Sequence, residues 1–321
     1  MWALADNFHI MRFGLQIPNF TAGAPGALFA EVLDRTSAAE ECGYDSVWVM
    51  DHFYQLPPMG GPTQPMIDAY TLLGAIAART ERVKLGALVT GVTYRNPAHL
   101  AKIVTSLDVI SAGRAILGIG AAWYDVEHEG LGFEFPPAGE RLDRLEEALQ
   151  ICRGMFAGTE PTFDGKYYRT HEAHNVPLPV QVGGPPILVG GGGEKKTLRL
   201  VAEYADMCNL FGDAATIAHK VGVLHRHCEA VGRDPSEITV SRLATLVLTE
   251  NEQETAATKD FLRQVTGEEP TGSNVGTADE LVGQVEELAA AGVDYFIFNI
   301  PTGSAETVRR VGDAVVARFA D

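Results

Sequence analysis

The chain has 321 residues, of which 46% are hydrophobic, and its 25 lysines and arginines against 42 aspartates and glutamates give a formal charge of −17. This is the composition of an ordinary globular protein, and its acidity argues against nucleic acid or an anionic membrane as a partner, since both need a positive surface. No apolar run approaches the roughly 20 residues of a membrane span.

The ends and the cysteines give further expectations. The opening MWALADNFHI lacks the basic head and long apolar centre of a signal peptide. The regular pattern begins near Met11, which predicts an N-terminal extension over residues 1–11 and makes Met11 a second candidate start site. Four scattered cysteines without CxxC spacing favour reduced, buried thiols in a cytoplasmic protein. These are Cys42, Cys152, Cys208 and Cys228.

Strand and helix patterns alternate along the chain. Strands are predicted at 12–17, 46–49, 83–89, 114–120, 186–193, 206–211, 237–248 and 292–300. Helices are predicted at 26–43, 68–80, 96–113, 139–156, 194–205, 214–231, 278–291 and 304–319. The helix at 96–113 is the best marked, because Asn96 suits the cap, Pro97 the first helical position and Gly113 the stop. A small hairpin is predicted at 162–169, outside the alternation.

Eight strands that are apolar on both faces indicate parallel strands covered by helices. We therefore predict a single (β/α)8 TIM barrel domain over residues 1–321, in preference to a doubly wound sheet. Two Pro- and Gly-rich regions, 54–67 and 159–186, exceed a minimal barrel. We expect loop insertions at the C-terminal face, where barrel enzymes place their sites, and regard both regions as candidate substrate walls.

Glycines end two of the predicted strands. The run Gly190–Gly193 leads into a helix, which offers backbone N–H groups to a phosphate, with Lys195, Lys196 and Arg199 as candidate cations. The alternative is a tight turn without a ligand. The segment GIGAAW (118–123) would let a flat ring or ribityl chain approach the backbone, or would simply serve close packing in the barrel.

The second strand ends in Asp51 and His52, an unusual finish for a buried run. An imidazole titrates near neutrality and can exchange a proton with a carbonyl or alcohol, while Asp51 could hold a polar group of a ligand. The alternative is a capping aspartate beside a satisfied, partly buried histidine. The remaining histidines have no ligand spacing or partners that would favour a metal site.

The stretches GLQIPNF, GYDSVWVMDHF and PILVGGGGEKKTLRLVAEYADMCNLF, with the long segment from LGALVTG through GIGAAWYDVEHEGLGFEF to RLEEAL, resemble the bacterial luciferase-like superfamily. Within it they resemble the coenzyme F-420 (deazaflavin)-dependent oxidoreductases. The resemblance runs from about residue 12 to 300, and its most specific part lies between Asp51 and Glu147.

The resemblance implies a barrel, usually homodimeric, with the deazaflavin across its C-terminal mouth. It implies that His52 is the proton donor or acceptor and that Asp51 contacts the cofactor. It also implies a strand-three bulge, often with a non-proline cis peptide, that supports the ring. The other implied cofactor-binding residues are Leu88, Val89, Thr90, Gly120, Ala121, Ala122, Gly190, Gly191, Gly192 and Gly193.

One position departs from the family pattern. Members that oxidise a sugar phosphate carry a glutamate where this chain has Trp123, and Trp123 with Tyr124 predicts a flatter, more apolar substrate. The expected function is hydride transfer between coenzyme F-420 and a small organic substrate. The alternatives are an FMN-dependent luciferase-like monooxygenase on the same barrel and a non-catalytic flavin-binding barrel.

Overall fold

The structure is a computed structural model that describes residues 11–21, 23–266, 272–300 and 303–320; residues 1–10 of the predicted extension lie outside this range. Eight parallel strands form a closed ring. In ring order they are β1 (Arg12–Ile17), β2 (Ser46–Val49), β3 (Lys84–Ala87), β5 (Ala115–Gly120), β8 (Ile187–Gly190), β9 (Met207–Leu210), β10 (Thr239–Leu248) and β12 (Tyr295–Asn299).

The ring closes because β1 pairs on one side with β2 and on the other with β12. Leu15 lies opposite Val47 in the first pairing and opposite Phe298 in the second. These eight strands are the eight that the sequence pattern predicts, so the predicted (β/α)8 barrel is confirmed. All eight strands of the ring run parallel, and their carboxyl ends therefore meet at one mouth.

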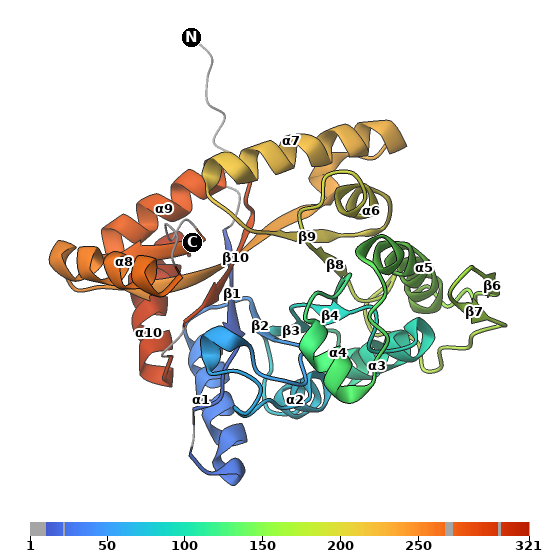
Figure 1. Ribbon diagram of the computed structural model, residues 1–321, viewed down its shortest axis with the longest axis horizontal. Helices are drawn as coiled ribbons and strands as arrows, with labels where there is room; N and C mark the ends of the chain where they lie inside the picture. Colours follow the sequence, from blue (N-terminus) through green and yellow to red (C-terminus); the bar gives the residue numbers. More distant parts are fainter. Residues whose placement is uncertain (1–10, 22, 267–271, 301–302, 321) are drawn as a thin grey trace.

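Helices surround the strands (Figure 1). They are α1 (Leu28–Glu41), α2 (Ala69–Ala77), α3 (Pro97–Ile110), α5 (Ala138–Phe156), α6 (Thr197–Tyr204), α7 (Ala214–Val231), α9 (Ala278–Ala290) and α10 (Ala305–Ala314). The predicted caps of α3 are confirmed. The Asn96 side chain accepts a hydrogen bond from the Ala98 N–H at 2.9 Å, Pro97 opens the helix, and Gly113 adopts a φ of 90° just beyond its end.

Several short or polar elements were not predicted. A seven-residue helix, α4 (Asp125–Leu131), follows β5. The two-residue strand β4 (Thr90–Gly91) pairs with β5. After β10 come α8 (Glu252–Thr266) and β11 (Ser273–Gly276), which extends the sheet outside the ring. Each is too short or too polar to show a clear apolar period.

The inside of the barrel is packed with side chains. Trp48 is fully buried there, together with Tyr295 and Ile297. A Cβ atom on Gly86 would lie 2.5 Å from the Trp48 ring. Gly86 on β3 therefore makes room for the indole of Trp48 on β2, which explains how so large a ring fits inside the barrel.

The two insertions lie in different places. The loop 54–67 follows the carboxyl end of β2, as predicted. The region 159–186 instead follows a helix and packs on the outside of α3 and α5. There Asp108 accepts hydrogen bonds from the backbone of Val180 and Gln181, and Lys102 donates to the carbonyl of Val176. The expectation that this region forms a substrate wall is therefore wrong. It contains the predicted hairpin, as β6 (Phe163–Asp164) and β7 (Arg169–Thr170).

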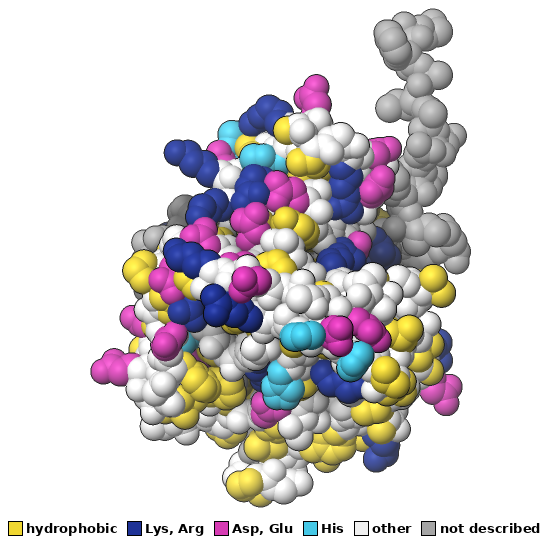
Figure 2. All heavy atoms as spheres, turned by 90° about the vertical axis from the view of Figure 1, so that its right-hand side faces the viewer, with side chains coloured by type: hydrophobic (Ala, Val, Ile, Leu, Met, Phe, Trp, Pro, Cys, Tyr) yellow, Lys and Arg dark blue, Asp and Glu magenta, His cyan; other side chains and the backbone are white. Residues whose placement is uncertain are grey.

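Acidic and basic side chains lie next to one another on the side of the molecule shown in Figure 2, with hydrophobic side chains gathered mostly in the lower half of the view. All four cysteines are free, and three of them are buried. Among the described residues, no helix has both the length and the apolar character needed to cross a membrane.

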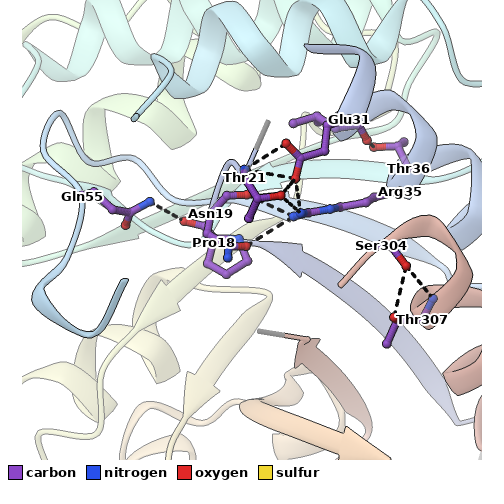
Figure 3. A network of polar contacts seen from close by, with 10 residues as sticks. Pro18, Asn19, Thr21, Glu31, Arg35, Thr36, Gln55, Ser304 and Thr307 are labelled. Carbon is purple, nitrogen blue, oxygen red and sulfur yellow. Dashed lines mark hydrogen bonds and ion pairs between the residues drawn. The ribbon is translucent and has the colours of Figure 1, made fainter. Parts of the chain in front are cut away.

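Arg35 ties the chain that leaves β1 to helix α1 (Figure 3). The residue is only 4% exposed. The guanidinium donates to the Asn19 carbonyl at 3.0 Å and pairs with Glu31, which in turn accepts from the Thr21 backbone at 2.9 Å. Nearby, the Gln55 side chain donates to the Pro18 carbonyl at 3.0 Å. The turn after β1 is thus held by one buried cation.

Replacing that cation should weaken the fold. Arg35→Met keeps the aliphatic bulk but leaves the Asn19 carbonyl and Glu31 without their charged donor, so the free energy of unfolding should fall by about 2 kcal/mol. Urea denaturation followed by circular dichroism measures this. Arg309→Met is the matched control, because Arg309 pairs with Glu41 at the exposed surface and its loss should leave the midpoint unchanged. Equal urea midpoints for Arg35→Met and Arg309→Met would contradict the stabilising role that we assign to Arg35.

Candidate active site

A cavity of about 370 Å³ opens at the carboxyl ends of the barrel strands, and most of its surface is apolar. Nine residues singled out from the sequence line it together. They are His52, Leu88, Val89, Gly120, Ala121, Ala122, Trp123, Gly190 and Gly191. The ends of β2, β3, β5 and β8 supply them, so the closed ring brings together residues up to 139 positions apart, from His52 to Gly191.

The other predicted site residues do not line this cavity. Gly192 and Gly193 lie beyond its edge, and Thr90 is fully buried with its hydroxyl 2.7 Å from that of Tyr70. Tyr124 is buried behind His52, with the two ring centroids 5.8 Å apart. Asp51 is 1% exposed and faces away from the cavity lining. Direct contact of Asp51, Thr90, Gly192 and Gly193 with a cofactor, and of Tyr124 with a substrate, remains a prediction.

His52 is held by a carboxylate that the sequence did not single out. Its Nδ1 lies 2.7 Å from Oε1 of Glu127, a residue of α4 that is completely buried. The Tyr94 hydroxyl also donates to this oxygen. Burial alone would raise the pKa of Glu127, but the hydrogen bonds from His52 and Tyr94 outweigh burial and lower it. Glu127 is therefore an ionised acceptor behind the imidazole.

Asp51 forms a second buried ion pair beside the first. Arg95 donates to both of its oxygens, at 2.6 and 3.0 Å, in the two-pronged geometry that guanidinium and carboxylate favour. Burial raises the pKa of Asp51, and Arg95 offsets only part of this effect. The adjacent residues at the end of β2 thus turn to opposite sides, with His52 in the cavity and Asp51 in the packed wall.

The end of β3 forms the floor of a slot. The Leu88–Val89 peptide bond is cis, as the family resemblance implied. Val89 faces glycines on two neighbouring strands. A Cβ atom on Gly120 would lie 3.0 Å from a methyl of Val89, and one on Gly190 would lie 2.9 Å from it. The absence of side chains at these positions gives Val89 the room it occupies, and all three residues line the cavity.

The cations near the glycine run differ from those expected. Lys196 pairs with Asp143 at 2.5 Å, and Arg199 pairs with Glu146 and Glu203, so both are bound to carboxylates outside the cavity. Lys195 is exposed and does not line the cavity either. Arg141 of α5 does line the cavity, and its side chain donates a hydrogen bond to the Ala121 carbonyl at 2.8 Å. Burial lowers its pKa.

Sequence reasoning missed Glu127, Arg141 and Phe211, all of which bear on the site. No spacing rule connects Glu127 to His52, since 75 positions separate them and the short helix that carries Glu127 has no apolar period. The one available signal was the concentration of aromatic residues from Trp123 to Phe135. Trp123 and Tyr124 pack against His52, and Phe133 and Phe135 pack around Tyr94 and His128.

A closed (β/α)8 barrel with an apolar slot and an imidazole–carboxylate pair at its carboxyl mouth is the layout of a barrel enzyme, in which the strand ends and the loops after them form the site. The comparison with known families gives a more specific result. The luciferase-like monooxygenase model matches residues 11–309, so the chain belongs to that family.

Curated relatives include F420-dependent glucose-6-phosphate dehydrogenases. The chain is 37% identical to that of Microbacterium testaceum over 177 residues, which are 55% of this chain and 51% of that protein. It is 39% identical to that of Intrasporangium calvum over 178 residues, 54% of this chain and 50% of that protein. The chain therefore spans about half the length of the curated relatives it matches.

Among solved structures, the coenzyme F420-dependent tetrahydromethanopterin reductase of Methanopyrus kandleri superposes with a TM-score of 0.80 at 20% identity, covering 97% of this chain and 99% of that one. A monooxygenase from Streptomyces bottropensis gives 0.79 at 22% identity, covering 97% and 100%. At these identities the likeness establishes the fold.

Removal of Arg95 should destabilise the protein more at neutral than at acid pH. In Arg95→Met the buried Asp51 loses its partner, and its pKa rises further above its unfolded value. The cost is absent where both states are protonated, grows as the pH rises from the unfolded pKa toward the raised folded pKa, and is fully present above the folded pKa. We expect a loss of about 3 kcal/mol at pH 7 and a smaller one at pH 4, measured by urea denaturation. Asp51→Asn combined with Arg95→Met should recover part of the loss at pH 7, and no recovery would contradict this account.

Proposed function

We propose that the protein is an oxidoreductase that transfers a hydride between coenzyme F-420 and a small organic substrate. The observation that carries the proposal is the imidazole of His52, backed by a buried carboxylate, on the wall of an apolar slot with glycine edges. The names of the curated relatives support F-420 as the cofactor.

The residues of the slot fit such a group. A flat ring would lie against Val89 and the backbone of Gly120 and Gly190, all of which line the cavity. A phosphate would find the backbone of Gly191, the hydroxyl of Thr197 and the guanidinium of Arg141 in the same cavity. When bound, the deazaflavin supplies the hydride chemistry.

The chain itself would supply position, a dry environment and a proton. His52 is 12% exposed at its side chain and lies on the cavity wall, where it can exchange the proton that accompanies hydride transfer. The apolar lining of Leu88, Val89 and Leu243 keeps water away from the slot.

The substrate we propose is flat and apolar. Trp123 is 61% exposed and Phe211 is 58% exposed, although both line the cavity, so two large aromatic faces are open at its rim. Among the described residues, Arg141 is the one lysine or arginine in the lining, and it is the candidate cation for the cofactor phosphate. A sugar phosphate, as in the names of the curated relatives, would need a second cationic site.

Two further assignments go with this proposal. A homodimer is supported by exposed aliphatic side chains at one end of α3 and along the neighbouring insertion. These are Val109, Ile110, Val176, Leu178, Val180 and Val182. A cytoplasmic setting is supported by the four free cysteines.

The choice of cofactor can be read from tryptophan fluorescence. Trp123 lines the cavity, so binding of F-420 should quench the emission of the protein, and the titration gives its Kd. An FMN-dependent monooxygenase, the alternative on this barrel, predicts tight quenching by FMN instead. Tight FMN binding without a response to F-420 would overturn the proposal.

The role of the imidazole can be tested at constant cofactor affinity. His52→Ala should retain F-420 binding and lower the rate of re-oxidation of reduced F-420 by about 10²- to 10⁴-fold, because the proton route is lost. The substrates would be enones, quinones, imines and nitroaromatics. His99→Ala, an exposed histidine on α3, is the control and should behave as the wild type. If neither the wild type nor the two variants re-oxidised reduced F-420 with these substrates, the result would favour a non-catalytic flavin-binding barrel.

A further inference from the structure

We propose that Glu127 is the positioning residue of His52, fixing its Nδ1 as the protonated nitrogen and leaving Nε2 as the one that serves the cavity. This inference rests on the proposed function, since it matters for catalysis only if His52 exchanges the proton. It assigns a role to a residue of α4 that does not itself line the cavity.

Both oxygens of Glu127 are fully used. Oε1 accepts from the Tyr94 hydroxyl and lies 2.7 Å from Nδ1 of His52, while Oε2 accepts from the backbone of Phe53 at 2.7 Å and of Tyr54 at 3.2 Å. An ionised carboxylate has no proton to donate. The hydrogen bond to His52 therefore requires the proton on Nδ1, and the neutral imidazole must present an unprotonated Nε2.

The same carboxylate also fixes where the imidazole stands. By accepting from Phe53 and Tyr54 it holds the backbone immediately after His52, so the start of the loop and the ring are fixed by one group. Trp123 and Tyr124 meet the ring edge-on, with centroids 5.7 and 5.8 Å away, and limit its rotation. A side chain locked in this way needs little reorganisation when it gives or takes a proton.

Other titratable groups lie near the pair and would shape any pH profile. The ring of His128 packs on Tyr94 at 5.0 Å, with its Nδ1 2.6 Å from the Tyr124 carbonyl and its Nε2 2.7 Å from the Thr93 hydroxyl. Other charged or titratable groups near the pair include Tyr54, Tyr124, Asp51 with Arg95 and Asp68, and Arg141.

The test is Glu127→Gln. The amide oxygen can still accept from Phe53 and Tyr54, but the amide nitrogen would donate to Nδ1 and move the imidazole proton to Nε2. In the cofactor-free protein, ¹⁵N NMR of the histidines at pH 8 should give the Nδ1–H form of His52 in the wild type and the Nε2–H form in the variant. With F-420, kcat should fall about a hundredfold or more with little change in KM, and the His52 limb of the pH profile should move to lower pH.

Glu129→Gln is the matched control, because Glu129 is an exposed residue on the same short helix, and it should leave the tautomer and kcat unchanged. An Nε2–H form in the wild type, or an unchanged tautomer and pH profile in Glu127→Gln, would overturn the inference. The wild-type spectrum shows which nitrogen of His52 carries the proton even if Glu127→Gln does not fold. If His52→Ala keeps full activity while Glu127→Gln switches the tautomer, the positioning stands and the proposed role of His52 fails instead.

Discussion

Closure of the strand ring between β1 and β12 is the constraint on which the site depends. Parallel pairing all the way round leaves no sheet edge within the ring and turns every carboxyl end toward one mouth. The packed interior around Trp48 keeps the ring from collapsing, and the cavity lies above this plug. Residues distant in sequence become neighbours for this reason alone.

Two buried carboxylates carry out different tasks at that mouth. Asp51 is paired with Arg95 and belongs to the wall, whereas Glu127 stays ionised, is stabilised by hydrogen bonds and belongs to His52. Neither carboxylate lines the cavity, so the imidazole of His52 is the group of this pair of sites that is placed to exchange a proton with a bound ligand. Burying the charges behind the ring keeps the slot itself apolar.

The fold could be predicted because each barrel strand carries its own apolar run, and His52 because it stands at the end of one. Glu127, the partner of His52, could not be predicted, because the polar helix α4 has no apolar periodicity and the Glu127–His52 contact depends on tertiary packing. Lys196 and Arg199 are next to the glycines in sequence, but the turn of α6 directs them toward acids of α5. The region 159–186 looked like a substrate wall by composition, yet its place after a helix puts it on the outside.

Val89 has a consequence for efforts to redesign the cavity. Its methyl groups occupy the volume that side chains at Gly120 and Gly190 would need, so these three positions share one space. A library that enlarges either glycine alone would create overlap with Val89, whereas a smaller residue at position 89 would release room for both. The shape of the slot is therefore a property of a triplet drawn from three strand ends, and a larger side chain at either glycine requires a smaller one at position 89.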